Sequence, residues 1–271
     1  MNARQQYWKR ESPDRRFSCG LPGLILPLVA CWLAFSPPPL PAATPAWVHR
    51  PYLQNVREDR ATVMWSAKED VASTVRYSTD SSFALAAVAR VRAFQPFETG
   101  MQFTFYQYQA ELTGLSPGTA YSYRVLMGAD NVTPVPESDY RFRTSGQGRY
   151  SFLLFGDSGA GTPSQSEVTF RMVAEKPDFV VHVGDIAYEL GTYQQFTDNY
   201  FEYYWTLMRR ACFFTVPGNH EYYTPGAAPY LALHASPTET VPFPDRGRYY
   251  SFDWGNTHFV ALDPNLLHPL F

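Results

Sequence analysis

Three apolar runs in the second half of the chain each end in glycine and then in polar residues. The motifs that follow the runs are Gly156-Asp157-Ser158-Gly159, Gly184-Asp185-Ile186-Ala187-Tyr188 and Gly218-Asn219-His220-Glu221. Continuous apolar runs that end in glycine predict buried strands of a parallel sheet. Asp157, Asp185 and Asn219 follow one another at intervals of roughly 30 residues, which suits βαβ units. Because parallel strands end at one edge of a sheet, these three side chains are expected to converge.

Helical and hairpin patterns surround these runs. Apolar residues recur at helical spacing between positions 193 and 210, and a glycine-rich loop followed by a helix is expected between Asp157 and Lys176. The alternating stretch 249–263 predicts a hairpin that turns at Gly255-Asn256. Strands that alternate with helices indicate an α/β sandwich for residues 149–271.

Residues 46–145 carry a different pattern, in which short apolar or alternating runs are separated by turn residues. The runs are 61–65, 74–77, 103–110, 121–127 and 140–142. Such spacing predicts an all-β sandwich. The segment from Leu112 to Tyr121 resembles the corner of a fibronectin type III sandwich, in which Tyr121 would hydrogen-bond back across the turn and Trp65 would lie in the core. We expect this domain to fold on its own, with 145–148 as a linker.

Converging carboxylates need a cation. Two ionised aspartates close together repel each other, and one takes up a proton unless a cation is present. Hard oxygen donors favour Mg, Mn, Fe or Zn, and a central Asp185 is suited to bridge two ions about 3.5–4 Å apart. The alternative is that each Gly-Asp pair only turns the chain and caps the next helix. Three such motifs in register, the third ending in Asn-His-Glu, favour the metal site.

The three motifs resemble the first three of five metal-binding motifs in purple acid phosphatases, which are calcineurin-like metallophosphoesterases. Tyr188, three residues after Asp185, is typical of the purple branch. The resemblance implies a fold in which a fibronectin type III-like domain precedes an α/β metallophosphatase sandwich. It also implies Asp157 and Tyr188 on a ferric ion, Asp185 as the bridge, and Asn219 on a divalent partner, which is Zn, Fe or Mn. His220 would then be catalytic and lie beside the substrate phosphate.

The implied function is the hydrolysis of small-molecule phosphate monoesters at acidic pH by metal-hydroxide attack, with His220 orienting the phosphate or protonating the leaving alkoxide. The family's other motifs, Val-x-x-His and Gly-His-x-His, supply three histidine ligands, and the sequence reaches Phe271 without them. We therefore expect a C-terminally truncated chain that is inactive as it stands and exposes apolar sheet surface. Two rivals stay open: a metal-dependent phosphodiesterase of the same superfamily, and a noncatalytic exported binding module.

Residues 1–45 predict a targeting segment. Lys9-Arg10 and Arg15-Arg16 make a basic start, and the apolar stretch 21–35 is too short to span a membrane. Small residues within 37–43 suit signal-peptidase cleavage, and Cys31 lies in a lipobox-like sequence. The protein is expected to be secreted or periplasmic, with a membrane as partner only if Cys31 is lipidated.

The composition bears on the core and on the class of partner. Hydrophobic residues make up 45% of the chain and aromatic residues 17%, which is enough for a real core. The net charge of −3 argues against nucleic acid as the main partner. The oligomeric state stays open.

Overall fold

The computed structural model describes residues 44–239, 241–242 and 245–267 of the 271-residue chain. Apart from residues 44 and 45, the predicted leader lies outside these ranges, and so does Cys31. Export and lipidation therefore stay predictions. Within the described ranges, no helix combines the length and the apolarity that a membrane crossing needs.

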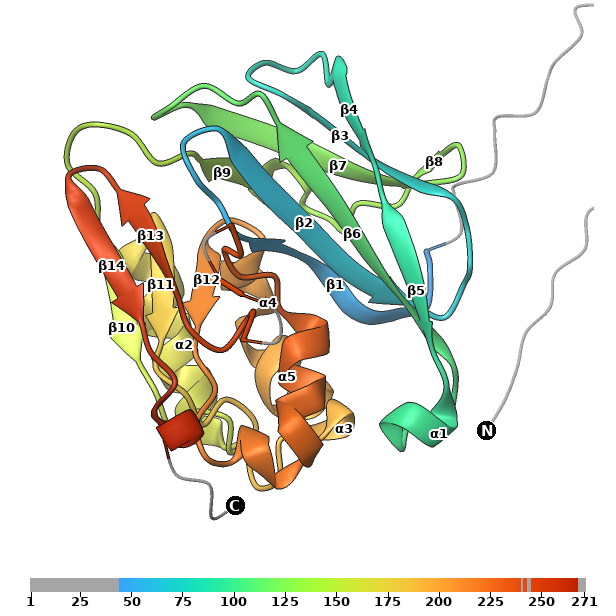
Figure 1. Ribbon diagram of the computed structural model, residues 1–271. Helices are drawn as coiled ribbons and strands as arrows, with labels where there is room; N and C mark the ends of the chain where they lie inside the picture. Colours follow the sequence, from blue (N-terminus) through green and yellow to red (C-terminus); the bar gives the residue numbers. More distant parts are fainter. Residues whose placement is uncertain (1–43, 240, 243–244, 268–271) are drawn as a thin grey trace, which may run out of the picture. The chain divides into compact units, whose positions relative to one another are not determined.

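Two antiparallel sheets form the first part of the described chain (Figure 1). One sheet has the strand order β1-β2-β6-β5, and the other has β4-β3-β7-β8 with β9 also paired to β7. The strands are β1 (Trp47–Gln54), β2 (Arg60–Ala67), β3 (Ser73–Ser78), β4 (Leu85–Val88), β5 (Arg90–Phe94), β6 (Phe105–Thr113), β7 (Ala120–Met127), β8 (Asp130–Asn131) and β9 (Arg141–Arg143). A short helix, α1 (Pro96–Thr99), lies between β5 and β6. The predicted all-β domain is confirmed.

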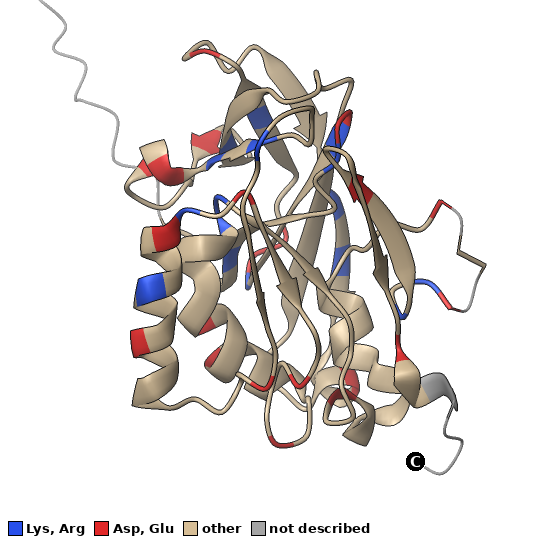
Figure 2. Ribbon diagram, turned by 90° about the vertical axis from the view of Figure 1, so that its left-hand side faces the viewer, with Lys and Arg blue, Asp and Glu red and all other residues tan. Residues whose placement is uncertain are grey.

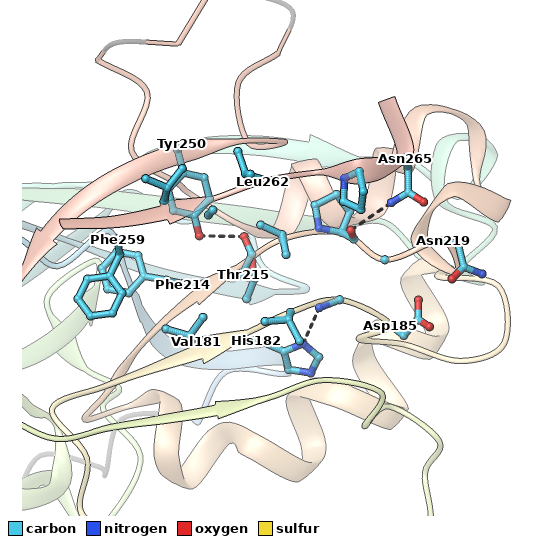
Figure 3. Close-up of a pocket in the computed structure, with 18 of the residues that line it drawn as sticks. Val181, His182, Asp185, Phe214, Thr215, Asn219, Tyr250, Phe259, Leu262 and Asn265 are labelled. Atoms are coloured by element: carbon cyan, nitrogen blue, oxygen red, sulfur yellow. Dashed lines mark hydrogen bonds between the residues drawn. The ribbon is translucent and has the colours of Figure 1, made fainter. Parts of the chain in front are cut away.

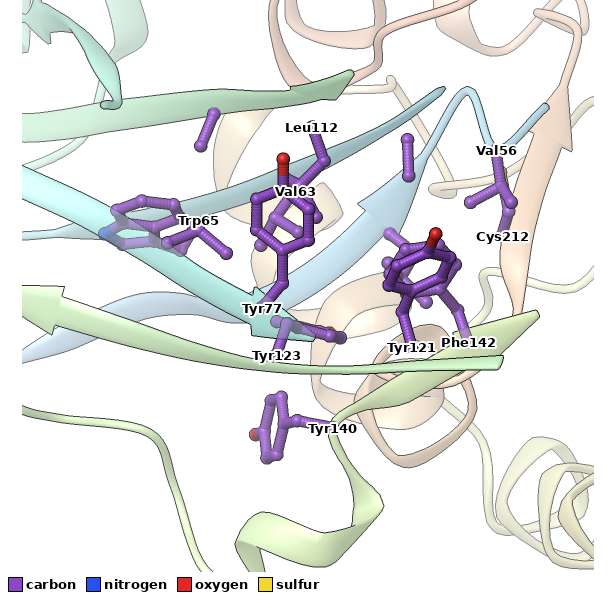
Figure 4. Close-up of a cluster of buried hydrophobic side chains, with 14 of the residues drawn as sticks. Val56, Val63, Trp65, Tyr77, Leu112, Tyr121, Tyr123, Tyr140, Phe142 and Cys212 are labelled. Atoms are coloured by element: carbon purple, nitrogen blue, oxygen red, sulfur yellow. The ribbon is translucent and has the colours of Figure 1, made fainter. Parts of the chain in front are cut away.

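Aromatic side chains from both sheets fill the core of this sandwich (Figure 4). Trp65 is fully buried and stacks on Tyr108 with 5.1 Å between ring centroids. The backbone N–H of Ser116 donates to the hydroxyl oxygen of Tyr121 at 3.0 Å. The corner expected from the sequence is therefore present, and it holds the start of β7 against the preceding turn.

The sequence pattern missed the strands β1, β4 and β5, and also the exposed two-residue strand β8. Strand β1 buries side chains on both of its faces, so it lacks the alternation that marks a half-buried strand. Strands β4 and β5 are short and almost entirely exposed, so burial imposes no apolar pattern on them.

The second part holds a three-stranded parallel sheet with the order β10-β11-β12. Its strands are β10 (Phe152–Phe155), β11 (Phe179–His182) and β12 (Cys212–Thr215). Between them lie α2 (Pro163–Glu175) in the first connection, and α3 (Tyr193–Gln195), the π-helical η2 (Phe196–Phe201) and α4 (Glu202–Met208) in the second. The parallel strands and the intervening helices predicted from the motif spacing are confirmed.

Beyond β12 the chain forms short helical turns and a hairpin. The elements are η3 (Glu221–Tyr223), η4 (Pro225–Ala227), α5 (Ala228–Leu233), β13 (Tyr250–Trp254), β14 (Thr257–Ala261) and η5 (Pro264–Leu267). The hairpin turns at Gly255-Asn256, as predicted. Apolar side chains on β10 and β14 face outward, with Leu154 63% and Val260 61% exposed. The expected exposed apolar sheet surface is therefore present.

The sandwich and the α/β part share buried contacts. Tyr52 of β1 donates its hydroxyl to the carbonyl of Leu233 at 2.7 Å, and Tyr123 of β7 donates to the carbonyl of Arg209 at 2.9 Å. Phe105 of β6 belongs to the same apolar cluster as residues of η2 and α4. The α/β part thus covers part of the apolar surface of the sandwich. That the sandwich folds on its own stays a prediction.

Candidate metal centre

The three glycine motifs lie at the same edge of the parallel sheet because its strands are in register. Phe155, His182 and Thr215 pair across the last row of β10, β11 and β12. The backbone ladder continues past the strands, since the N–H of Asp157 donates to the carbonyl of Gly184 at 3.1 Å. The predicted ligands are therefore brought to one edge, as the topology requires.

Close approach of the loops depends on an unusual backbone. Asp157 and Asp185 have positive φ angles of 53° and 52°, a region that aspartate tolerates better than most residues. A Cβ atom at Gly218 would lie 2.1 Å from Asp185 Oδ1, and one at Gly159 would lie 1.8 Å from the carbonyl oxygen of Ile186. Only glycine fits at these two contacts.

Tyr188 joins the two carboxylates. Its hydroxyl donates to Asp157 Oδ1 at 2.9 Å and lies 3.3 Å from Asp185 Oδ2. Burial and then the two carboxylates raise the pKa of Tyr188 above its ordinary value. The phenol therefore keeps its proton in the absence of a cation. Three oxygen donors from two loops meet at this point.

Asp157 and Asp185 lack a cationic partner within the described ranges, where neither takes part in an ion pair. Figure 2 shows acidic segments on the loops along the lower edge of the view. Adjacent carboxylates beside a phenol are donors that a hard cation binds, so these residues fit a metal ion. The described residues contain no group of three or more His, Cys, Asp or Glu suited to a metal. The candidate donors that meet here are two carboxylates and one phenol, and the exposed Asn219 lines the same cavity as both aspartates.

His220 lies beside this donor set. Its ring meets the ring of Tyr188 edge to face, with 4.4 Å between the centroids. Its Nδ1 donates to the carbonyl of Glu189 at 2.6 Å, because a carbonyl can only accept. In the neutral ring the proton is then on Nδ1, and Nε2 is left free to accept a proton or a hydrogen bond.

Two buried side chains support the loops. His182 accepts at Nδ1 from the N–H of Gly184 at 3.3 Å and donates from Nε2 to Ser158 Oγ at 2.8 Å. Sequence reasoning gave no role to Glu221, whose carboxylate is fully buried. The signal for it is an acidic residue directly after Asn-His in a motif that follows a buried strand.

A cavity of about 420 Å³ runs from the ligand loops to the space between the parallel sheet and the β13–β14 hairpin. Asp185 and Asn219 lie at one end of it, whereas Val181, Phe214 and Phe259 line the other end (Figure 3). The polar end has the donors for a cation, and the apolar end offers it no ligand.

Family models match the two parts separately. Residues 48–144 match the model described as purple acid phosphatase, N-terminal domain, and residues 150–265 match the model described as calcineurin-like phosphoesterase. Human acid phosphatase type 7 is 27% identical over 229 residues, which cover 82% of this chain and 49% of that protein. Probable inactive purple acid phosphatase 9 of Arabidopsis thaliana is 24% identical over 269 residues, covering 80% of this chain and 41% of that protein. The chain spans about half the length, or less, of these curated relatives.

Solved structures share the fold. A purple acid phosphatase from seeds of yellow lupin (Lupinus luteus) superimposes with a TM-score of 0.67 at 20% identity, covering 81% of this chain and 46% of that one. The structure of PhoD gives a TM-score of 0.56 at 17% identity, covering 83% of this chain and 53% of the other. At these identities the likeness concerns the arrangement of the chain.

Proposed function

We propose that this chain, which belongs to the purple acid phosphatase family of calcineurin-like phosphoesterases, supplies part of the ligand set of a metal centre of the kind that hydrolyses phosphate monoesters. The observation that carries the proposal is that the Tyr188 hydroxyl lies within 3.3 Å of the carboxylates of both Asp157 and Asp185, neither of which forms an ion pair within the described ranges. Enzymes of this family depend on two metal ions. When bound, such ions attract the phosphate and activate a water molecule.

The donor types suggest where each ion binds. Asp157 and Tyr188 would hold a ferric ion, because a phenol whose pKa is raised needs a highly charged cation to lose its proton. Asp185 lies between the first loop and the third, which suits a bridging role. Asn219 supplies a neutral oxygen for a divalent partner, for which Zn, Fe and Mn are the candidates.

His220 is the proposed catalytic residue. Its Nδ1–H is held by the carbonyl of Glu189, so the ring cannot turn without losing that hydrogen bond. Nε2 is then the atom that would take up the second proton of the ring, and in the protonated ring Nε2–H can donate to the phosphate or give its proton to the leaving alkoxide. Tyr188 packs against the ring and limits its tilt.

The four donors suit one cation with water in its remaining positions, whereas two ions of four to six ligands each would need more groups. We therefore expect the 271-residue chain to bind one cation with modest affinity and to show little or no turnover of phosphate monoesters. A noncatalytic role stays a second candidate, because one relative is named a probable inactive purple acid phosphatase. The substrate class, the absence of a nucleic-acid partner and the secreted or periplasmic location belong to the proposal.

Substitution of Asp185 tests the proposal. Calorimetric titration of the chain with Mn²⁺, and then with inorganic phosphate, is expected to show phosphate binding only when Mn²⁺ is present. Asp185→Ala should weaken Mn²⁺ binding by at least about 100-fold, since it removes a charged ligand shared by the site. The matched control is Asp198→Ala, an exposed aspartate whose carboxylate accepts from Gln194, which should leave both affinities unchanged.

Equal Mn²⁺ affinity in wild type and Asp185→Ala would contradict the proposed centre. Activity assays separate the rivals. Turnover of p-nitrophenyl phosphate that Asp185→Ala abolishes would show that this chain suffices for catalysis. Preferential turnover of bis-p-nitrophenyl phosphate would favour the phosphodiesterase. Metal and phosphate binding without any turnover is the result expected of a binding module.

A further inference from the structure

Glu221 is a carboxylate surrounded by backbone N–H groups. Its Oε2 accepts from Gly218 at 2.7 Å and from Asp185 at 3.0 Å, and its Oε1 accepts from Ile186 at 2.8 Å and from Ala187 at 3.1 Å. Three of these donors belong to the second ligand loop and one to the third. The side chain therefore connects the loop of Asp185 with the loop of Asn219.

Such a carboxylate is placed to hold backbone and not to bind a ligand. Glu221 has no exposed surface, and burying a carboxylate is costly unless hydrogen bonds compensate it. Each of its oxygens already accepts two N–H groups, which uses their main acceptor directions. Removing the carboxylate would leave four N–H groups of the two ligand loops without their partner.

The position of Asp185 depends on this contact. Its backbone N–H is held by Glu221, and its Oδ1 accepts from the backbone N–H of His220 at 3.2 Å. Asp185 has a positive φ and touches Gly218. The hydrogen bonds on both sides of this residue therefore stabilise a backbone conformation that is otherwise unfavourable. We propose that Glu221 is a positioning residue of the metal centre, which sets the distance between Asp185 and Asn219.

This inference rests on the proposed function, because it assumes that Asp185 and Asn219 bind metal. Glu221→Gln keeps the size of the side chain but turns an NH₂ group toward two backbone donors. We expect it to raise the dissociation constant for Mn²⁺ by about 10–100-fold, the usual effect of losing a partner that orients metal ligands. Glu221→Ala should weaken binding further. With Fe³⁺ in place of Mn²⁺, a visible absorption band is expected when Tyr188 loses its proton on binding the ferric ion. Glu221→Gln should also shift this band.

The matched control is Gln107→Leu, which removes a buried hydrogen-bonding side chain from β6, far along the chain from the ligand loops. It should lower the melting temperature and leave the Mn²⁺ affinity unchanged. A purely structural role for Glu221 would give the same result as this control, with a lower melting temperature and wild-type affinity. That outcome, in a chain whose Mn²⁺ binding still needs Asp185, would overturn the inference and leave the proposed function standing.

Hydrogen exchange tests the contact in the wild-type chain, so the inference does not depend on whether the variants fold. The amides of Asp185, Ile186, Ala187 and Gly218 are expected to be protected in the metal-free chain to the level of β11. Rapid exchange of these amides would overturn the inference. A wild-type chain that binds no Mn²⁺ would instead contradict the proposed function. Slow exchange of these amides would in that case show only that Glu221 holds the two loops together.

Discussion

Acidification from pH 6.5 to 4.5 is expected to lower the free energy of unfolding by about 7 kcal/mol, which is comparable with the whole stability of a typical domain. Three histidines are responsible. Burial lowers the pKa of His49 to about 3, that of His182 to about 3 and that of His234 to about 4. Each is neutral in the folded chain, whereas in the unfolded chain it binds a proton at its ordinary pKa of about 6.5.

The sign follows from proton uptake. Because the unfolded state binds more protons than the folded state between about pH 6.5 and about pH 4, stability falls as the pH falls through this window. With three such groups the slope approaches about 4 kcal/mol per pH unit. The lowest pH at which this protein stays folded would then be set by proton uptake at these three histidines.

Urea unfolding at several pH values measures this slope. His234→Gln should reduce it by about one third, since one of three protons is removed. His258→Gln is the matched control, because His258 lies on an exposed face of β14. A free energy of unfolding that is flat across this pH window, or a slope that His234→Gln leaves unchanged, would contradict the prediction.

Gly218→Ala is expected to abolish Mn²⁺ binding, with a loss of more than about 100-fold in affinity. The added Cβ would lie 2.1 Å from Asp185 Oδ1 and 2.3 Å from its backbone nitrogen, so the carboxylate and its loop must move. Overpacking of this kind also costs about 1–3 kcal/mol of stability.

Gly100→Ala provides the comparison for the alanine substitution itself. Gly100 has a φ of 71°, and no atom of the described residues lies within 4 Å of the position that an added methyl group would take. Only the backbone penalty of about 1 kcal/mol therefore applies. The substitution should lower stability slightly and leave Mn²⁺ binding intact. Calorimetry measures the Mn²⁺ affinity of both variants, and chemical unfolding measures their stability. Wild-type Mn²⁺ affinity in Gly218→Ala would contradict the close contact between Gly218 and Asp185.

The sequence predicted the ligand edge because its signals are local. Each apolar run ends in glycine, and parallel register alone then brings Asp157, Asp185 and Asn219 together. The corner at Tyr121 was likewise predictable, since its turn residues and tyrosine lie within one short segment. In both cases one strand and the loop next to it carry the information.

Features that depend on several distant segments were not predictable. Strand β1 buries both faces because the α/β part covers one of them, so its sequence has no alternation. The role of Glu221 arises only when the N–H groups of two loops converge on it. A buried acid looks polar in the sequence, and its partners are backbone atoms that no residue type reveals.

Absorption spectroscopy of the ferric form tests the central claim most directly. Fe³⁺ added to the 271-residue chain is expected to produce a visible band, because Tyr188 loses its proton on binding beside Asp157 and Asp185. Tyr188→Phe should abolish the band and keep the fold, since only one hydroxyl at the edge of the site is removed. Tyr223→Phe, at an exposed tyrosine that packs against His220, is the control and should retain the band. A band of full strength in Tyr188→Phe, or one that persists in Asp157→Ala, would contradict the metal centre described here.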